Sequence, residues 1–211
     1  MTPPKTANAD SAKILAGALC LDFVNTKSGR ATPEERERLV TYDDLLGWGV
    51  RAGLIEEARA GRLAARAAKK PAKAVRAVAR AHELREALHG IFAALASKAP
   101  PEERGLDALN EVLQRAAKRG GLAPAPEGNF AWRWEEDALE SPLWAIAHAG
   151  ASVLTGAELG RLRECGGHGC GWLFIDRSRN GTRRWCEMEV CGNRAKARRH
   201  HARRRAAEGA S

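Results

Sequence analysis

The sequence predicts a mainly α-helical fold with small β elements, and three observations support that fold class. Apolar residues recur at intervals of three and four over much of residues 41–156, which is the period of an amphipathic helix. Residues 130–134 alternate instead, as a half-buried strand does. Four of the five cysteines crowd into residues 165–191. We therefore expect a helical domain that carries a β-hairpin, followed by a small C-terminal module built around cysteines.

Composition divides the chain into three parts. Residues 1–13 are polar, contain proline and show no period, so we expect a flexible tail. Residues 14–158 form the expected helical domain, and residues 159–211 form the cysteine module. A chain of 211 residues with 44% hydrophobic residues is large and apolar enough for one sizeable domain and a small appendage.

The helical domain is expected to begin with a buried element and a capped helix. The run ALCLDFVNT, residues 18–26, is apolar and short, and its period leaves strand and helix open. Thr41 is suited to cap a helix whose first turn holds Asp43 and Asp44 and which ends before Gly53. A short helix is therefore expected after Thr41.

Three longer helices and a hairpin are expected next. Residues 56–69 are rich in Ala and Arg and indicate one helix, which Pro71 separates from a long amphipathic helix. The apolar face of that long helix comprises Val75, Val78, Ala81, Leu84, Leu88, Ile91, Phe92 and Leu95. Residues 102–119 repeat the pattern until two glycines stop it. The hairpin follows at residues 122–134, and residues 139–156 indicate a last core helix entered through a Ser-Pro step.

Positive charge is concentrated at the end of the chain. The net charge is +9, but residues 161–211 hold 13 of the 35 Lys and Arg residues and 5 of the 26 Asp and Glu residues, a net charge of +8. The first 160 residues therefore carry a net charge of only +1. Localised charge of one sign indicates a polyanionic partner.

The sequence argues against membrane insertion and secretion. No run approaches the ~18 consecutive apolar residues of a membrane helix, and the N-terminus lacks the basic-then-apolar order of a secretory signal. We therefore expect a cytoplasmic protein without a membrane partner. In a reducing compartment, clustered cysteines favour a metal site over disulfides.

The spacing Cys-x4-Cys-x15-Cys-x4-Cys points to a metal site made by Cys165, Cys170, Cys186 and Cys191. Two close pairs build a closed tetrahedral thiolate site from two local turns, and the preferred ion is Zn²⁺. Four thiolates leave no position for water or substrate, so the ion would be structural. Two alternatives remain: His168 replaces one cysteine, or the cysteines are buried free thiols.

The residues around the cysteines predict a small finger. Residues 172–175 favour a strand, Asn180-Gly181 a turn, and residues 182–186 a returning strand. Helix-forming residues follow Cys191 without a breaker, so the last ligand should sit at or just before a helix N-terminus. Such a unit is a treble-clef-like zinc finger, a hairpin plus a basic helix, and we expect zinc to dominate its stability with roughly 10–16 kcal/mol.

Several residues of the module resemble the CGNR zinc-finger family. They are Cys165, Cys170, Trp172, Phe174, Asp176, Ser178, Arg179, Asn180, Trp185, Cys186, Cys191, Gly192, Asn193 and Arg194. Upstream, LCLDFVNT at residues 19–26 and YDDLLGW at residues 42–48 resemble the ABATE domain, which usually precedes this finger in bacterial proteins described as stress-induced transcription regulators. The resemblance spans nearly the whole chain and implies zinc and DNA binding.

The cations of the finger are the candidate nucleic-acid contacts. They are Arg177, Arg179, Arg183, Arg184, Arg194, Lys196, Arg198, Arg199 and Arg203. Arginine favours forked contacts to phosphate, and a helix held by a metal site could enter a major groove. The alternative is a solvated basic tail that aids solubility or binds RNA without specificity. Trp172 and Trp185 are expected to pack the finger rather than to stack on bases.

The helical domain offers one candidate ligand site. Asp22, Asn25 and Thr26 place polar groups in an apolar setting and could line a small-molecule pocket. The alternative is that they cap the next element and satisfy buried backbone groups. His82 and His89 are too far apart on one helix to share a metal and are expected to flank the core.

These features predict a zinc-dependent, DNA-binding transcription regulator with a helical sensing or dimerising domain. The prediction leaves open an unidentified small-molecule effector and a homodimer. An RNA-binding or protein-interaction zinc module is the alternative. An enzyme with its site in the helical domain is disfavoured, because the chain has no Gly-rich phosphate loop, no His-Glu metal pair and no nucleophile elbow.

Overall fold

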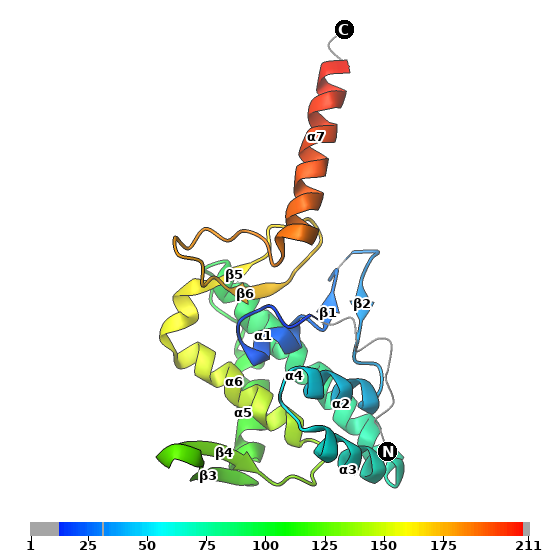
Figure 1. Ribbon diagram of the computed structural model, residues 1–211, viewed down its shortest axis with the longest axis vertical. Helices are drawn as coiled ribbons and strands as arrows, with labels where there is room; N and C mark the ends of the chain where they lie inside the picture. Colours follow the sequence, from blue (N-terminus) through cyan, green and yellow to red (C-terminus); the bar gives the residue numbers. More distant parts are fainter. Residues whose placement is uncertain (1–12, 31, 209–211) are drawn as a thin grey trace.

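The computed structural model describes residues 13–30 and 32–208. The expected tail, apart from Lys13, lies outside the described residues. The fold is mainly helical with small antiparallel strand pairs, as the sequence predicts. The helices are α1 (Leu19–Val24), α2 (Tyr42–Arg51), α3 (Glu57–Ala68), α4 (Pro71–Ala96), α5 (Glu103–Ala117), α6 (Ser141–Thr155) and α7 (Asn193–Glu208). Helices α1–α6 form the body, and α7 projects from one end of it (Figure 1).

The strands form three separate antiparallel pairs. They are β1 (Lys27–Ser28) with β2 (Arg36–Glu37), β3 (Gly120–Pro124) with β4 (Phe130–Trp134), and β5 (Leu162–Glu164) with β6 (Leu173–Ile175). The β3–β4 hairpin is the one that the sequence predicts, and it lies at the end of the body opposite α7 (Figure 1). The short β1–β2 pair was not expected from the sequence.

The first two helices show why local sequence is informative at this end of the chain. The apolar run at residues 18–26, whose period fits a strand or a helix, contains helix α1, and five of the six residues of α1 are buried. Helix α2 starts as predicted at a capping box: Asp44 N–H donates to Thr41 Oγ1 at 3.1 Å, and Thr41 N–H donates to the Asp44 carboxylate at 2.7 Å. Reciprocal caps of this kind satisfy amides that the helix itself leaves unpaired.

Helix α4 runs through the centre of the body, but its buried face starts one residue earlier than expected. Val75 is 69% exposed, which contradicts its predicted place in the core. Ala74 and Ala77 are buried there instead, next to α3. A three-and-four spacing admits either choice, and small alanines let two helices approach closely. From Val78 to Phe92 the predicted face is buried as expected.

The β3–β4 hairpin carries exposed aromatic residues. Phe130 is 70% exposed and Trp132 is 45% exposed, so the strand is less buried than its alternation predicts. The Trp132 and Trp134 rings stack 6.2 Å apart, and His148 of α6 contacts both rings. These contacts pack the two tryptophans of the hairpin against α6.

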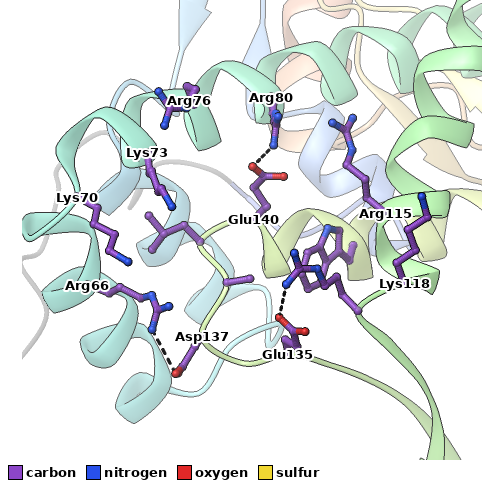
Figure 2. Close-up of a pocket in the computed structure, with 14 residues that line it drawn as sticks. Arg66, Lys70, Lys73, Arg76, Arg80, Arg115, Lys118, Glu135, Asp137 and Glu140 are labelled. Atoms are coloured by element: carbon purple, nitrogen blue, oxygen red, sulfur yellow. Dashed lines mark hydrogen bonds and ion pairs between the residues drawn. The ribbon is translucent and has the colours of Figure 1, made fainter.

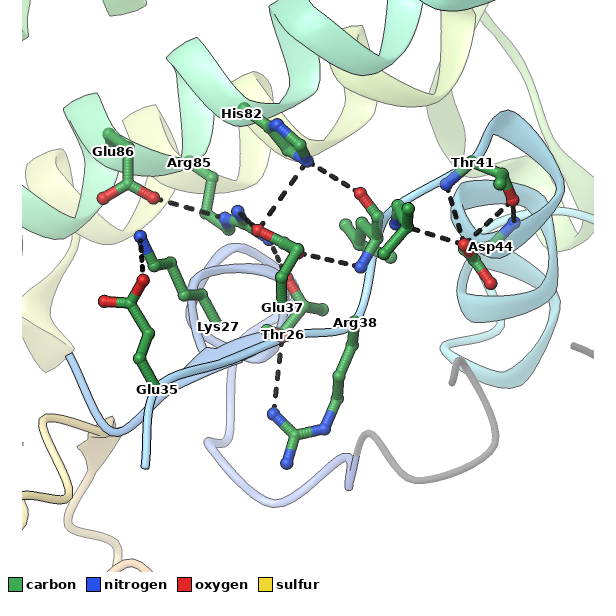
Figure 3. A network of polar contacts seen from close by, with 12 residues as sticks. Thr26, Lys27, Glu35, Glu37, Arg38, Thr41, Asp44, His82, Arg85 and Glu86 are labelled. Carbon is green, nitrogen blue, oxygen red and sulfur yellow. Dashed lines mark hydrogen bonds and ion pairs between the residues drawn. The ribbon is translucent and has the colours of Figure 1, made fainter. Parts of the chain in front are cut away.

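A buried arginine joins the β1–β2 pair to α4. Arg85 is 1% exposed and forms a bidentate ion pair with Glu37 of β2 (Figure 3). It also donates to Thr26 Oγ1 at 3.0 Å, and its Nε lies 3.4 Å from a carboxylate oxygen of Glu86. His82, on the same helix, donates from Nε2 to the Leu39 carbonyl oxygen at 2.7 Å. This network fixes the β1–β2 hairpin on the body.

One hydrophobic core runs from the helical domain into the cysteine module. Leu173, Phe174 and Ile175 of β6 are buried in the same cluster as α1, α4 and α6. Ile175 N–H donates to the Ala16 carbonyl oxygen at 2.8 Å, which adds a backbone bond across the expected boundary at residue 158. The two parts are therefore packed together although their sequences differ in character. None of the helices in the described ranges is long and apolar enough to cross a membrane.

Candidate metal centre and basic helix

The four predicted ligands come together at the base of α7. The sulfur atoms of Cys165, Cys170, Cys186 and Cys191 all lie within 4.8 Å of one another. The Sγ atoms of Cys170 and Cys186 are 3.7 Å apart, and those of Cys186 and Cys191 are 3.6 Å apart. His168 is exposed on the turn after Cys165 and is outside this cluster. The arrangement therefore uses four thiolates rather than three and a histidine.

The distances fit a tetrahedral ion. Metal–sulfur bonds of about 2.3 Å in a tetrahedron place neighbouring sulfurs about 3.8 Å apart, close to the two separations of 3.7 and 3.6 Å. None of the five cysteines, all of which lie in the described residues, forms a disulfide. The fourth cysteine sulfur thus completes a closed set with no open position for a substrate.

Backbone groups around Cys165 are arranged for a thiolate. Gly167 N–H and Cys186 N–H donate to Cys165 Sγ at 3.4 and 3.2 Å. Contacts with the Cys170 and Cys186 sulfurs, with these amides, hold the pKa of the Cys165 thiol well below its ordinary value. A Cβ at position 167 would lie 3.0 Å from Cys191 Sγ, so a glycine is needed where the backbone wraps the site. Backbone groups near both cysteine pairs thus form the cradle.

The sequence predicts the wrong pairing partner for the strand at residues 172–175. Strand β6 pairs with β5, upstream of Cys165, and residues 182–186 form no strand. The cause is a loop held by a side chain: Asp176 accepts from Ser178 N–H, Ser178 Oγ–H and Arg183 N–H. These bonds close the loop locally, so the chain does not return beside β6. The expected turn is present, with Gly181 at a φ of +61°.

The last ligand leads directly into the basic helix. Cys191 lies in a single π-helical turn, Met188–Gly192, and α7 begins at Asn193. This confirms the prediction that it sits just before a helix N-terminus. Beyond Ala195, the residues of α7 whose side chains are described, up to Arg205, are exposed. The metal centre therefore fixes the root of a helix that has solvent on every side (Figure 1).

The predicted nucleic-acid contacts divide into two groups. Arg177 forms a bidentate pair with Glu158 at 2.7 Å, and Arg183 lies 4.3 Å over the Phe174 ring and donates to the Trp185 carbonyl oxygen. Both of these arginines therefore have a role within the fold. Arg177 is nonetheless exposed, and so are the remaining candidates: Arg179, Arg184, Arg194, Lys196, Arg198, Arg199 and Arg203. The two tryptophans follow the packing expectation, because Trp172 is buried and Trp185 lies against Gly166 and Gly192.

A cleft of about 850 Å³ lies between the β1–β2 hairpin and the metal centre. Arg36 and Arg38 of the hairpin line one side, and Arg194 and Arg198 of α7 line the other. Sequence reasoning missed the first two arginines because they lie far from the cysteines in a segment with no recognisable pattern. The structure thus extends the basic surface of the finger onto the helical domain.

The residues expected to line a ligand pocket are bonded inside the protein. The Asp22 carboxylate accepts from the amides of Leu15 and Ala16 at 2.8 and 2.9 Å. The Thr26 hydroxyl donates to the Phe23 carbonyl oxygen at 2.6 Å. These contacts are the ones expected under the alternative interpretation, in which the polar side chains satisfy buried backbone groups. A ligand-binding role for the three residues stays a prediction.

Asn25 connects the two parts of the chain. Its amide donates to the Leu173 carbonyl oxygen at 2.9 Å and accepts from Leu173 N–H at 3.0 Å, and it is 3% exposed. The side chain thus pairs with β6 as a neighbouring strand would. Because it holds both backbone groups of one finger residue, Asn25 positions the cysteine module on α1.

We expect Asn25→Ala to lower the free energy of unfolding by about 2 kcal/mol, because it leaves a buried donor and a buried acceptor of Leu173 unpaired. Urea unfolding of the metal-loaded protein measures the change. Asn110→Ala, an exposed asparagine on α5, is the control and should change stability by less than about 0.5 kcal/mol. Equal stability of the two variants would contradict the connecting role.

Two family matches cover most of the chain. The model of the ABATE family, described as "Putative stress-induced transcription regulator", matches residues 17–157. The model of the CGNR zinc finger matches residues 161–204, which include all four clustered cysteines. No curated protein matches the chain. Neither family description names an enzyme activity.

Proposed function

Because the chain belongs to the ABATE family and ends in a CGNR zinc finger, we propose that it is a zinc-dependent DNA-binding transcription regulator. The observation that carries the proposal is helix α7, a strongly basic helix that projects from the body and is rooted in the four-cysteine centre (Figure 1). The ion would be Zn²⁺, since four thiolates in a closed tetrahedron suit this metal. It would hold the backbone of the finger and take no part in chemistry.

The charge on α7 is suited to a polyanion. Residues 193–208 contain seven Lys and Arg residues and one acidic residue, Glu208. The side chains of Arg194, Arg198 and Arg199 are exposed. Without an anion such a helix repels itself, since like charges four residues apart destabilise a helix. A duplex supplies phosphates along both edges of a groove that accepts one α-helix.

The β1–β2 hairpin gives α7 a neighbour in this role. Arg36 and Arg38 face the first turns of α7 across the cleft, and Arg38 is anchored by a hydrogen bond to Ser28 Oγ at 2.9 Å. Cations on both sides of a helix contact phosphates of both strands when the helix lies in a groove. In this arrangement the helical domain orients the finger on DNA. A homodimer of this domain stays a prediction.

We expect the double variant Arg198→Ala, Arg199→Ala to weaken binding to all duplexes alike and to reduce the slope of log affinity against log salt by about one to two units. The reason is that binding releases about one fewer counterion from the duplex for each phosphate-contacting cation that the variant lacks. Fluorescence anisotropy on two unrelated duplexes, titrated with salt, measures the slope. If the arginines read guanine edges instead, the loss should be about 1–3 kcal/mol per contact and concentrate on particular sequences.

The matched control is Arg104→Ala, Arg133→Ala, which removes the same charge from exposed residues of α5 and β4. It should leave DNA affinity and salt slope unchanged. A structured RNA is titrated beside the duplexes, because tighter binding to RNA would favour the alternative, an RNA-binding module. A chain that binds neither nucleic acid in a salt-dependent way would exclude the proposal and leave a protein-interaction finger.

A further inference from the structure

A second basic site lies in the helical domain, at the end of the molecule opposite α7 (Figures 1 and 2). It is a pocket of about 500 Å³ between α3, α4, α5 and the segment that links β4 to α6. Eight cations and three carboxylates line it. The cations are Arg66, Lys70, Lys73, Arg76, Arg80, Arg115, Lys118 and Arg119. The net charge of the lining is therefore about +5. The first 160 residues of the chain, to which the whole lining belongs, carry a net charge of only +1.

The three carboxylates are already engaged. Asp137 pairs with Arg66 at 3.3 Å, Glu135 pairs with Arg119 at 2.9 Å, and Glu140 pairs with Arg80 (Figure 2). These acids all come from the linking segment, which they tie to three different elements. The segment therefore forms one wall of the pocket with its charge neutralised.

Four cations of the pocket have no carboxylate partner among the described residues: Lys70, Lys73, Arg76 and Lys118. Lys70 and Lys73 extend from the start of α4 toward the same hollow (Figure 2). Like charges gathered around one hollow repel one another, and no carboxylate in the described part of the chain pairs with these four cations. A bound anion would remove that repulsion.

We propose that this pocket binds a small molecule with a chain of two or more phosphate groups. Several separate cations around one hollow match several negative charges on one ligand, and Lys and Arg are the side chains that contact phosphate oxygens. A volume of about 500 Å³ suits a nucleotide or an inorganic phosphate chain. Ala138, Leu139 and Trp144 add apolar groups to the lining, but eight of its fourteen residues are Lys or Arg, so we expect phosphate contacts to dominate recognition.

A small anion fits the pocket better than a nucleic acid does. The cations surround a hollow, whereas a duplex phosphate backbone needs a ridge or an open groove that follows it. The site also differs from the residues Asp22, Asn25 and Thr26 that the sequence favoured for a ligand. The binding proposal does not depend on DNA binding. If both proposals hold, this ligand would be an effector of the regulator.

The test is isothermal titration of the full, metal-loaded chain with inorganic triphosphate and, separately, with ATP at physiological ionic strength. The double variant Lys70→Ala, Lys73→Ala should weaken the affinity by about tenfold or more, because it removes two charge-assisted contacts. Comparable affinities for triphosphate and ATP would assign recognition to the phosphate chain. Tighter binding of ATP would assign the nucleotide as the source of that chain.

Two controls make the result decisive. Arg104→Ala, Arg133→Ala removes the same charge from exposed residues outside the pocket and outside α7, and should bind triphosphate as the native chain does. Without ligand, the pocket variant should melt at the same or a higher temperature than the native chain, because repulsion is relieved, and triphosphate should raise its melting temperature less. No binding of either anion, or an equal loss in the control variant, would overturn the proposal. The proposal would also be overturned if the native chain did not bind triphosphate and the pocket variant bound duplex DNA more weakly than the native chain.

Discussion

Cys186→Ser is expected to abolish stoichiometric metal binding and to cause the largest loss of stability of any single change in the chain. The ion would be held by four clustered sulfurs, and removing one would leave an open, weaker site. A structural zinc site contributes about 10–16 kcal/mol of apparent free energy in small zinc modules, more than the total stability of most domains. Elemental analysis of the purified variant gives the metal content directly.

The loss should not stop at the finger. The sequence predicts two parts with separate sources of stability, whereas the core is continuous from α1 to β6. Losing the metal centre frees β6, and then the side chain of Asn25 and the carbonyl of Ala16 lose their partners. We therefore expect hydrogen exchange to accelerate in α1 as well as in residues 165–205. Helix α3, which lies at the end of the body away from β6, should keep more of its protection (Figure 1).

Cys20→Ala is the matched control for this experiment. Cys20 is fully buried in the core but is not one of the clustered cysteines, and burial raises the pKa of its thiol to about 12. The control should keep one metal per chain and lose only about 1 kcal/mol. A Cys186→Ser protein that retains a full equivalent of metal, or whose residues 165–205 resist proteolysis, would refute the metal centre described here.

The parts of the fold that could be predicted from sequence are those that a few neighbouring residues determine. The cap of α2 needs only Thr41 and Asp44, and the metal centre needs only the cysteine spacing and two turns. Helix periods located α3 to α6 for the same reason. In each case the information lies in one continuous stretch of the chain, from a single helical turn for the cap to residues 165–191 for the cysteines.

The parts that could not be predicted depend on residues far apart in sequence. Strand β6 was expected to pair with residues 182–186 but pairs with β5, and Asp176 favours that outcome by closing the intervening loop. The basic pocket at α3–α5 is also invisible in sequence, since the net charge of the domain is near zero while its charges are segregated in space. Local patterns carry no record of such tertiary choices.

Arg85 is the plainest case of a missed residue. An arginine between Leu84 and Leu88 on an apolar helix face would be assigned to solvent, yet its side chain is only 2% exposed. Its partner Glu37 lies in a two-residue strand that no pattern indicated. Burial of a guanidinium group requires a partner of opposite charge, which that carboxylate supplies. The pair therefore fixes the β1–β2 hairpin, which carries Arg36 and Arg38 to the cleft beside α7.

Glu37→Gln is expected to lower the free energy of unfolding by about 3 kcal/mol, the lower part of the range for breaking a buried ion pair, because Glu86 still lies near Arg85. Replacing both partners, Glu37→Gln with Arg85→Met, should recover much of the loss, since no charge is then left buried. The control is Glu83→Gln, which replaces an exposed residue of α4, the helix that carries Arg85, and should hardly change the free energy of unfolding. Urea unfolding of the four proteins measures these differences.

The effect of Glu37→Gln should also depend on pH in a defined direction. Partial burial opposes ionisation of Glu37, but hydrogen bonds from Arg85 and from Leu39 N–H, with the charges of Arg85 and His82, outweigh it and lower the pKa of the carboxyl. A lowered pKa in the folded state means that the ionised carboxylate stabilises the fold above its ordinary pKa, near 4.5. That contribution is lost as the pH falls through the folded-state value.

The stability difference between the native chain and Glu37→Gln should therefore be constant near neutral pH and shrink below about pH 4.5. Metal loss in acid affects both proteins and cancels in the difference. A difference that grows on acidification, or that is absent at neutral pH, would show that Arg85 does not depend on Glu37.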